Sequence, residues 1–297
     1  MLTGVRIVFL GGDARQIEII RKCVEMDAGV STVGFDLWEG QLPGAAKAEL
    51  TDSLLSEADA LVLPVVGCDD EGQVGAKYSS VPLRIGPEQI AALPAHCTVY
   101  TGMAKPFLRK LCRERGLRLT ELLEQDDVAI YNSIPTAEGA LAMVIQNTDF
   151  TIHGSAAVVL GMGRTGFTMA RSLQGLGARV RVGVRRREHY ARAEEMGWQA
   201  FMTEDLGRNL ADADLVFNTI PSMILNAQMI SKLPAHACVI DLASSPGGTD
   251  FRYAEKRGIR ALLAPGLPGI VAPKTAGIIM ANALVECIRA ESREQEG

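Results

Sequence analysis

The chain has 297 residues, which is enough for about two domains of ordinary size. Hydrophobic residues make up 47% and charged residues 22%, ordinary values that exclude a disordered, collagenous or low-complexity chain. The 30 basic and 35 acidic residues give a net charge of −5 without a basic block, so we expect no nucleic-acid partner.

We expect no targeting or membrane signal at either end of the chain. The first apolar run is broken at residues 11–13, too early for the core of a signal peptide. The apolar run at 276–288 is shorter than the roughly 20 residues that span a bilayer. Six scattered cysteines lack the spacing of a metal site and indicate reduced thiols. We therefore expect a cytoplasmic protein with no membrane segment and no metal.

Four short apolar segments of the first half recur in the same order in the second half. They are 5–12, 29–34, 57–63 and 93–99, echoed by 156–163, 178–183, 212–217 and 233–239. Runs rich in Val, Ile and Leu without polar alternation are typical of strands buried on both faces of a parallel sheet. Stretches with helical spacing separate them. The pattern predicts an α/β chain of two doubly wound, Rossmann-like domains with a cleft between them.

The predicted domain boundary lies near the middle of the chain. We place the first domain at 1–135 and the second at 136–297, with Thr136 as the cap of a connecting helix. A final helix over 275–297 is also expected. In two-domain folds of this kind such a helix often packs back on the first domain.

A glycine loop in the second half predicts a dinucleotide site. Residues 161–166 fit the pattern G-x-G-x-x-G between an apolar strand and a helix. Gly161 allows the tight turn, Gly163 a close approach to a pyrophosphate, and Gly166 close packing of helix on strand. An ordinary glycine-rich turn is the alternative, but the context favours a cofactor. We expect contacts from the whole loop: Gly161, Met162, Gly163, Arg164, Thr165 and Gly166.

The residues after the next predicted strand bear on which cofactor binds. NAD enzymes place a carboxylate there, whereas this chain has Arg185, Arg186 and Arg187 before Glu188. Guanidinium groups match a 2′-phosphate and stay charged. We therefore predict NADP, held by Arg185 and Arg186, with NAD as the alternative. A solvated basic helix start would also explain the arginines, although cations disfavour a helix N-terminus.

The first domain lacks the residues of such a dinucleotide site. Gln16 stands where the third glycine would fall, and Asp13 would repel a pyrophosphate. Asp36 occupies a position where a ribose-binding acid could lie, so a nucleotide there is the less favoured interpretation. We assign the first domain to the substrate.

Loops rich in Pro, Gly and hydroxyl residues follow the later predicted strands. They cover 218–222, 241–248, 264–269 and 271–275. Ligands of open α/β sheets bind beyond the carboxyl ends of the strands, although turn chemistry explains the composition equally well. Further cofactor contacts are expected from Thr219, Ile220, Pro221, Asp241, Leu242 and Ala243.

Three cations adjoin the predicted cleft loops. Arg15, Lys105 and Lys274 suit a substrate that carries carboxylates, although each alone is more often a surface charge. His96 and His236 follow Pro-Ala turns at predicted strand starts, the wrong end of the sheet for catalysis. We interpret both histidines as structural.

Long, non-generic strings at 10–16, 127–139, 218–226 and 264–277 closely resemble the A subunits of dipicolinate synthases from spore-forming bacteria. The resemblance covers essentially the whole chain. It implies oxidation of the dihydrodipicolinate synthase product (4-hydroxy-tetrahydrodipicolinate or dihydrodipicolinate), on a branch of the lysine pathway, to pyridine-2,6-dicarboxylate. It also implies a partner, the flavoprotein-like B subunit of dipicolinate synthase, and expression in the mother cell during sporulation. A homo-oligomer is expected as well.

The second half also resembles the NAD-binding domain of D-2-hydroxyacid dehydrogenases. Those enzymes use an arginine and a histidine where this chain has 244–247 and 265–266, so their acid–base mechanism does not carry over. For the implied reaction, Arg15, Lys105 and Lys274 would bind carboxylates. Ring-orienting and catalytic roles are then hypotheses for the remaining polar candidates: Asn132, Ser133, Thr136 and Ser244 to orient the ring, with Lys274, Ser133, Glu138 and His153 as the catalytic group. Glu138 and His153 are the candidate bases.

Two alternatives remain open. The chain could be another NADP-dependent dehydrogenase of the shikimate or hydroxyacid type. It could also be a dinucleotide-binding scaffold whose partner carries the chemistry.

Overall fold

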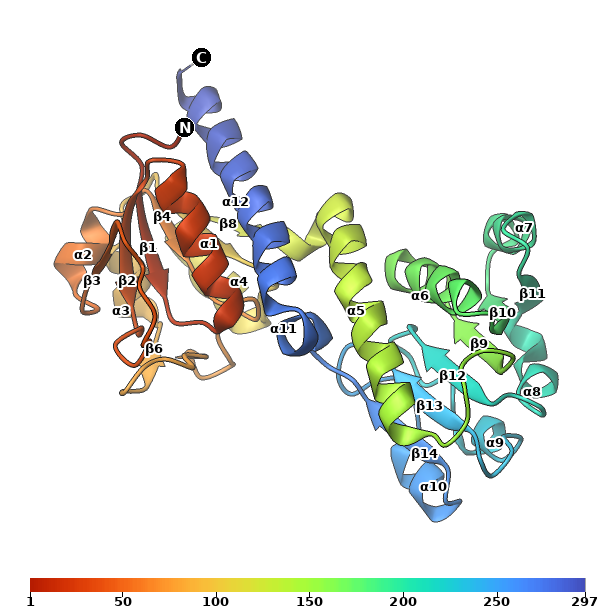
Figure 1. The fold of residues 1–297 in the computed structure, drawn as a ribbon. Helices are drawn as coiled ribbons and strands as arrows, with labels where there is room; N and C mark the ends of the chain where they lie inside the picture. Colours follow the sequence, from red (N-terminus) through yellow and green to blue (C-terminus); the bar gives the residue numbers. More distant parts are fainter. Residues whose placement is uncertain (297) are drawn as a thin grey trace. The chain divides into compact units, whose positions relative to one another are not determined.

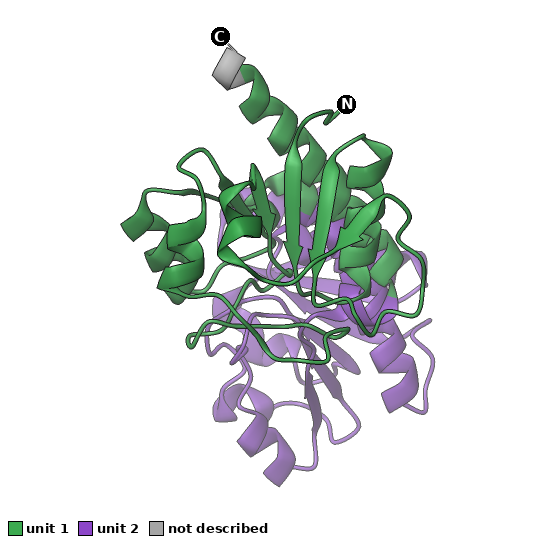
Figure 2. Ribbon diagram, turned by 90° about the vertical axis from the view of Figure 1, so that its left-hand side faces the viewer, with its two compact units in different colours: residues 1–128, 272–297 green, residues 129–271 purple. Residues whose placement is uncertain are grey.

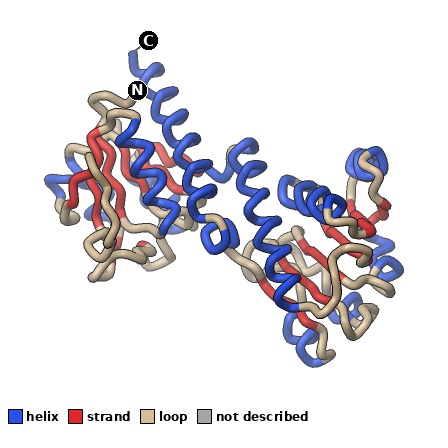
Figure 3. Tube along the Cα trace, in the orientation of Figure 1, coloured by secondary structure: helices blue, strands red, loops and turns tan. Residues whose placement is uncertain are grey.

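The computed structural model describes residues 1–296, with side chains for residues 1–293. The chain forms two compact units, residues 1–128 with the segment from residue 272 onward, and residues 129–271 (Figure 2). We call them unit 1 and unit 2. Each holds a parallel sheet accompanied by helices (Figure 3). The predicted α/β class with two Rossmann-like sheets is confirmed.

Unit 1 contains strands β1 to β8, several of which are labelled in Figure 1. Its elements are β1 (Arg6–Leu10), α1 (Ala14–Glu25), β2 (Gly29–Val33), β3 (Ala45–Lys47), α2 (Asp52–Ser56), β4 (Ala60–Val62), β5 (Gln73–Val74), β6 (Leu83–Arg84), α3 (Pro87–Ala92), β7 (Thr98–Thr101), α4 (Pro106–Arg115), β8 (Arg118–Glu121), the short helix η1 (Leu122–Glu124) and the C-terminal helix α12 (Pro273–Glu296).

Helix α5 (Asp126–Asn147) leads from unit 1 into unit 2. The elements that follow are β9 (Ala156–Leu160), α6 (Arg164–Gly175), β10 (Arg179–Val184), α7 (Arg187–Glu195), β11 (Gln199–Met202), η2 (Thr203–Asp205), α8 (Leu206–Asn209), β12 (Leu215–Asn218), α9 (Ala227–Ile230), β13 (Cys238–Asp241), α10 (Phe251–Lys256), β14 (Arg260–Leu263) and α11 (Leu267–Val271).

The two sheets have the same topology. The strand order is β3-β2-β1-β4-β7-β8 in unit 1 and β11-β10-β9-β12-β13-β14 in unit 2. The repeated sequence segments form β1 and β9, β2 and β10, β4 and β12, and β7 and β13. Each member of a pair occupies the same place in its own sheet, so the repeated sequence segments form a repeated architecture.

Successive side chains of the central strands enter opposite cores. In β1, Ile7 and Phe9 pack with α1 and α12, whereas Val8 and Leu10 pack with α3 and α4. Strand β9 divides its side chains between two cores of unit 2 in the same way. Burial on both faces explains why these strands lack polar alternation.

The start of α5 differs from the prediction. The sequence predicts Thr136 as the cap of this helix, but the helix begins at Asp126 and continues through Pro135. The Thr136 hydroxyl instead donates to the Asn132 carbonyl one turn earlier, 2.8 Å away. Pro135 removes one backbone donor, and the helix continues through it because its apolar side chains after Pro135 pack in the core of unit 2.

By length and composition α5 is also apolar enough to cross a membrane, the only such helix within residues 1–296. Its Ala137, Ala140 and Val144 are nevertheless completely or almost completely buried in the core of unit 2. Core helices of globular proteins pass the same test, so α5 carries no argument for a membrane segment.

Helix α12 packs against α1 within unit 1. A methyl group added to Gly277 would lie 2.5 Å from the Arg15 carbonyl oxygen, so the two helix backbones nearly touch. Near its other end, Glu291 accepts hydrogen bonds from the hydroxyls of Thr98 and Tyr100, each at 2.8 Å. The last helix is thereby fixed to the sheet of unit 1.

Candidate functional site

The glycine loop between β9 and α6 has little spare space at its first and third glycines. Gly161 has a φ of +96°, which favours glycine, and a methyl group there would lie 2.4 Å from the Thr219 hydroxyl. A methyl group on Gly166 would lie 2.2 Å from the Gly161 carbonyl oxygen. At Gly163, by contrast, a methyl group would meet no atom within 4 Å. Of the three glycines in the loop, only Gly163 therefore faces open space.

A cavity of about 220 Å³ adjoins this open space in unit 2. Helix α6 starts beside it and has no side-chain cap, so backbone N–H groups of its first turn face the cavity end of the helix. Such an N-terminus binds anions well. The cavity is lined by Gly161, Met162, Gly163, Gly183, Val184, Arg185, Arg186, His189, Thr219, Ile220 and Pro221. These residues fit the pyrophosphate of a dinucleotide.

No carboxylate that the structure describes lines this cavity where it borders the end of β10. Strand β10 ends at Val184, and Arg185 and Arg186 follow directly. Arg186 contacts His189 and lies 3.1 Å from Glu188, whereas Arg185 forms no ion pair among the described side chains. Both arginines therefore border the position where NAD enzymes hold the ribose with an acid.

Eight of the predicted cofactor residues line this cavity, whereas Arg164, Thr165, Gly166, Asp241, Leu242 and Ala243 do not. Arg164 and Thr165 open α6, and Leu242 and Ala243 follow β13. Asp241 has a different role from the one expected, because it is completely buried and its carboxylate is saturated within the protein. It accepts hydrogen bonds from Asn218, Ala243, Gly248 and Thr249. Asp241 thus fixes the loop after β13 and has no atom available for a cofactor.

The corresponding place in unit 1 is filled by the chain itself. The Gly12 N–H donates to the Gly75 carbonyl at 2.8 Å, and the Lys77 N–H donates to the Gly12 carbonyl at 2.9 Å. Gln16, at the position of the third glycine, is buried and donates to the Leu63 carbonyl. The first glycine loop is therefore covered where a pyrophosphate would lie.

The alternative of a nucleotide at Asp36 also loses its support. The Asp36 carboxylate accepts the Ser80 N–H, at 3.1 Å from Oδ2, and its pKa is lowered mainly by the hydrogen bonding of Ser80. The segment that covers the glycine loop also engages the acid that a ribose would need.

Unit 1 instead has a larger cavity, of about 460 Å³, at the carboxyl ends of β1, β4 and β7. It brings together two of the predicted substrate residues, Arg15 and Lys105. It adds Lys77, which the sequence analysis missed. A backbone bridge between Gly12 and Ala76 brings Lys77 to this wall. The segment 66–85 has no periodic pattern that would have predicted this return.

Arg15 is already paired inside this cavity. Its Nε and Nη2 lie 3.0 and 2.6 Å from the two oxygens of Asp13, and its backbone N–H donates to the same carboxylate as a helix cap. Burial raises the pKa of Asp13, but the hydrogen bonds and charge of Arg15 outweigh it and keep the pKa below its usual range. The two charges largely neutralise each other.

The structure places several predicted substrate residues in unit 2, outside both cavities. Ser133 is 1% exposed, and its hydroxyl donates to the Ile130 carbonyl and meets the Thr168 hydroxyl. This hydroxyl serves the packing of α5 on α6 and cannot reach a ligand. Asn132 and Thr136 are partly buried on α5, and Ser244 is exposed in the loop after β13.

The three remaining candidates also lie outside the two cavities. His153 is exposed beside Gly177, at the amino ends of β9 and β10. Ligands bind at the opposite ends of such strands, so His153 loses its support as a base. Glu138 is exposed on α5, and Lys274 is exposed in the first turn of α12. Neither position excludes the role predicted for it.

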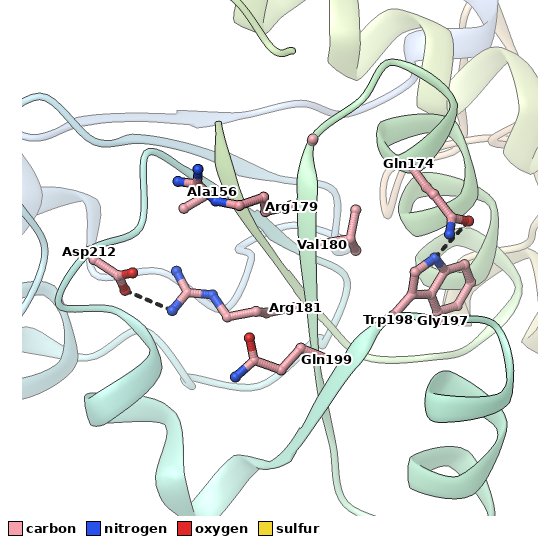
Figure 4. Close-up of a pocket in the computed structure, with 10 residues that line it drawn as sticks. Ala156, Gln174, Arg179, Val180, Arg181, Gly197, Trp198, Gln199 and Asp212 are labelled. Carbon is pink, nitrogen blue, oxygen red and sulfur yellow. Dashed lines mark hydrogen bonds and ion pairs between the residues drawn. The ribbon is translucent and has the colours of Figure 1, made fainter. Parts of the chain in front are cut away.

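Another cavity of unit 2, of about 320 Å³, lies at the amino end of the sheet (Figure 4). Arg181 pairs there with Asp212 at 2.7 Å. Its wall includes the first residues of three strands: Ala156, Arg179 and Gln199. Because it lies at the wrong end of the strands, we do not assign it to the cofactor.

The thiols offer no nucleophile. All six cysteines are free, and five are buried. Burial raises the pKa of the Cys23 thiol to about 12, which keeps it protonated and unreactive. Within the part of the chain that the structure describes, no three His, Cys, Asp or Glu side chains gather as metal ligands.

Comparisons with known proteins also divide the chain into two domains. The family model for the N-terminal domain of the dipicolinate synthase A subunit matches residues 6–123. The model "D-isomer specific 2-hydroxyacid dehydrogenase, NAD binding domain" matches residues 135–246. Unit 2 therefore carries a nucleotide-binding domain of the dehydrogenase type.

Two solved structures of dipicolinate synthase A subunits match nearly the whole chain. The crystal structure of the dipicolinate synthase A subunit from Bacillus halodurans matches with a TM-score of 0.93 at 48% identity, over 97% of this chain and 98% of that one. The corresponding chain of dipicolinate synthase from Bacillus subtilis matches with a TM-score of 0.94 at 47% identity, over 99% of both. A transhydrogenase from Sinorhizobium meliloti shares the fold alone, with a TM-score of 0.70 at 16% identity over 97% of this chain and 94% of that one.

Among curated proteins, the dipicolinate synthase A subunit of Bacillus subtilis (strain 168) is 48% identical over 297 residues, which is the whole of both chains. The chain therefore belongs to the family of dipicolinate synthase A subunits.

Proposed function

We propose that this chain oxidises the cyclic hydroxy-dicarboxylate made by dihydrodipicolinate synthase to pyridine-2,6-dicarboxylate, with NADP as the preferred hydride acceptor. The observation that carries the proposal is the cavity of unit 2. Its glycine loop is open at Gly163, and two arginines stand where an NAD enzyme has an acid. The name of the 48% identical relative supplies the product.

The reaction balances without a further oxidant. The substrate 4-hydroxy-tetrahydrodipicolinate loses one water, then one hydride and one proton, and the ring becomes an aromatic pyridine. When bound, the nicotinamide dinucleotide supplies the hydride acceptor. Aromatisation provides the driving force, so the protein has mainly to bind, orient and accept a proton.

Residues of unit 2 would hold the cofactor. The backbone of Gly161, Gly163 and the first turn of α6 would bind the pyrophosphate, and Arg185 and Arg186 the 2′-phosphate. Asp241 and Asn218 would act indirectly, by fixing the loops that border the site.

Residues of unit 1 would hold the substrate. The cavity beside Gly12 contains the cations that two carboxylates need, and Lys274 remains a further candidate. Of the proposed proton acceptors, Glu138 is retained, because its carboxylate is exposed and His153 lies at the amino end of the sheet. Asn132, Thr136 and Ser244 remain proposals for orienting the ring.

A partner protein is part of the proposal, because the relatives are named as the A subunit of an enzyme. By the resemblance, this partner is the flavoprotein-like B subunit of dipicolinate synthase, and the complex works in the cytoplasm of the mother cell during sporulation. Association of the chain with further copies of itself is part of the same proposal.

One experiment separates this function from its two rivals. The substrate is generated in place by dihydrodipicolinate synthase, and pyridine-2,6-dicarboxylate is followed with NADP or NAD, in the presence and absence of the partner protein. A parallel panel offers simple 2-oxo acids with NADPH. Turnover of any 2-oxo acid would favour a hydroxyacid-type dehydrogenase. Product formation that never requires the cofactor cavity of this chain, tested with Gly163→Ala, would favour a scaffold.

A further inference from the structure

We propose that Lys77 and Lys105 together bind the carboxylates of the substrate in unit 1. In the same proposal, the ion pair of Arg15 with Asp13 keeps Arg15 from binding these carboxylates. The inference rests on the proposed function in one respect, namely that the ligand is a dicarboxylate. It assigns a specificity-determining role to Lys77, a residue that sequence patterns did not single out.

The fold brings the two lysines to one cavity from distant parts of the chain. Lys77 is fixed by its backbone hydrogen bond to Gly12, at the carboxyl end of β1. Lys105 is the residue before α4 and follows β7, which is two strands away in the sheet. Both residues line the cavity of about 460 Å³. Both therefore lie at the end of the sheet where open α/β folds bind ligands.

Of the three cations in this cavity, only Arg15 is paired with an acidic side chain that the structure describes. Arg15 is neutralised by Asp13 through two hydrogen bonds, and its side chain is only 15% exposed. Lys77 and Lys105 form no ion pair with any side chain that the structure describes. The Lys77 ammonium lies 5.9 Å from the ring centre of Tyr78, and the charges of Lys77 and Lys105 act on Asp13 and Asp69 only from beyond ion-pair distance. A ligand carboxylate could therefore bind either lysine without displacing an acidic partner.

The other acid of the cavity is engaged by the backbone. Asp69 Oδ1 accepts the N–H groups of Glu71 and Gln73, at 2.9 and 2.8 Å. The hydrogen bond from Gln73 is the main cause that lowers its pKa, with smaller contributions from the charges of Lys105 and Arg84. With Arg15, Lys77 and Lys105 against Asp13 and Asp69, the cavity carries a formal charge of +3 − 2 = +1. This balance favours an anionic ligand.

The remaining wall suits a flat ring. Pro64, Val65, Val66 and Ala76 supply apolar surface to the same cavity as the two lysines and the paired Asp13. Small-molecule sites commonly combine such apolar walls with a few charged groups that fix orientation. A ring with two carboxylates matches this arrangement better than an acid with one carboxylate, because only the former can bind both lysines.

The role of Asp13 gives a prediction of opposite sign. Asp13→Asn keeps a side chain that can cap α1 and removes the negative charge that holds Arg15. The cavity then gains one positive charge, and Arg15 becomes free for the ligand. This variant should bind a dicarboxylate more tightly than the natural chain, whereas the lysine variants should bind it more weakly.

Isothermal titration of the full-length chain with pyridine-2,6-dicarboxylate and with pyridine-2-carboxylate tests the assignment. Lys77→Gln and Lys105→Gln should each weaken binding of the dicarboxylate about 10- to 100-fold, the effect of losing one charge-assisted hydrogen bond. Binding of the monocarboxylate should change less in at least one of the two variants. Asp13→Asn should tighten binding of the dicarboxylate. Lys47→Gln, which removes an exposed lysine of β3 outside the cavity, is the control for net charge.

Unchanged affinity in both lysine variants, or a loss in Lys47→Gln as large as theirs, would overturn the proposal. So would an absence of dicarboxylate binding by the natural chain at millimolar concentration. Thermal unfolding of each variant shows whether it remains folded, and Lys77→Arg, which keeps the charge, should restore most of the affinity.

The binding test and the function can fail separately. Tight binding through the lysines without any oxidation would leave the site standing and contradict the proposed reaction. Oxidation that proceeds with normal KM in both lysine variants would leave the reaction standing and contradict the site.

Discussion

His236 Nε2 lies 2.8 Å from Asp214 Oδ1, and the other oxygen of Asp214 accepts the Ala156 N–H at 2.7 Å. The contact joins the start of β9 to the turns before β12 and β13. It lies at the amino end of the sheet, opposite the cofactor cavity. A structural role for His236, predicted from its place after a Pro-Ala turn, is consistent with this geometry.

The same contact recurs in unit 1. His96 Nε2 lies 3.0 Å from Asp59 Oδ1, and Asp59 Oδ2 accepts the Arg6 N–H at 2.7 Å. The sequence echo at these histidines therefore preserves a pair of hydrogen bonds that ties three strands together at their amino ends, independently of what each unit binds.

The Asp214 contact predicts an acid-sensitive contribution to stability. Burial raises the pKa of Asp214, but the hydrogen bonds from Ala156 and His236 outweigh it and keep the pKa below the usual 3.8. A carboxyl with a lowered pKa in the folded state stabilises the fold above its unfolded pKa, and this stabilisation is lost as the pH falls through the folded value. Asp214→Asn should lower the free energy of unfolding at pH 7 by about 1–2 kcal/mol.

Thermal unfolding against pH checks this prediction. The difference between Asp214→Asn and the natural chain should shrink below about pH 4. Glu194→Gln, an exposed change on α7, is the control and should show no such difference. A difference that stays constant down to pH 3 would contradict the assigned role.

Two glycines of the cofactor loop should respond in opposite ways to the same change. Gly166→Ala forces a methyl group against the Gly161 carbonyl and should destabilise the chain by more than about 2 kcal/mol. Gly163→Ala meets no protein atom within 4 Å and should leave the melting temperature nearly unchanged. It should nevertheless weaken NADP binding by about tenfold or more, because its methyl group occupies the space of the pyrophosphate.

Melting temperatures and fluorescence titration with NADP separate the two effects. Each glycine variant serves as the control for the other. Normal NADP affinity in Gly163→Ala would show that the pyrophosphate lies elsewhere.

The arginines after β10 should determine the preference between the two dinucleotides. Replacing both Arg185 and Arg186 with Gln should raise the Kd for NADP by about tenfold or more, since charge-assisted contacts to phosphate are lost. The Kd for NAD should change much less, because its ribose carries no 2′-phosphate. Parallel titrations with both cofactors measure the ratio, with the exposed Arg208→Gln as control. An equal loss for both cofactors would contradict a role at the 2′-phosphate.

The hydrogen bonds that Glu291 of α12 accepts from Thr98 and Tyr100 should contribute to the stability of unit 1. Glu291→Ala would leave the hydroxyls of Thr98 and Tyr100 without their acceptor in the interior, which costs about 1–3 kcal/mol. Glu286→Ala, an exposed change on the same helix, is the matched control. Denaturation by urea provides the comparison, and equal midpoints for the two variants would show that these hydrogen bonds contribute nothing.

The sequence predicted the architecture well because the evidence for it is local: apolar runs separated by stretches with helical spacing, in the same order in both halves. Val8 and Phe9 enter opposite cores, and such strands have a composition that identifies a parallel sheet. The glycine loop was recognisable for the same kind of reason. Gly161 and Gly166 are required by backbone geometry that lies within six residues of chain.

The sequence was a poorer guide wherever the site depends on long-range contacts. Lys77 reaches its cavity because the neighbouring Ala76 forms a bridge with Gly12, more than sixty residues earlier in the chain, and the segment 66–85 that carries Lys77 has no periodic pattern. Asp241 and Ser133 are polar residues near predicted loops, and only the structure shows that the protein itself uses all their hydrogen-bonding capacity. The helix through Pro135 was missed because packing overrides the local preference of proline.

The central claim is that this chain catalyses hydride transfer from the substrate to NADP, and the stoichiometry of the two products tests it most directly. The purified chain, with and without the partner protein, is supplied with the dihydrodipicolinate synthase product and NADP, and reduced cofactor and pyridine-2,6-dicarboxylate are measured together over one time course. We predict equal amounts of both, and loss of both in Gly163→Ala. Pyridine-2,6-dicarboxylate formed without reduced cofactor, or no reduced cofactor although NADP binds, would contradict the account.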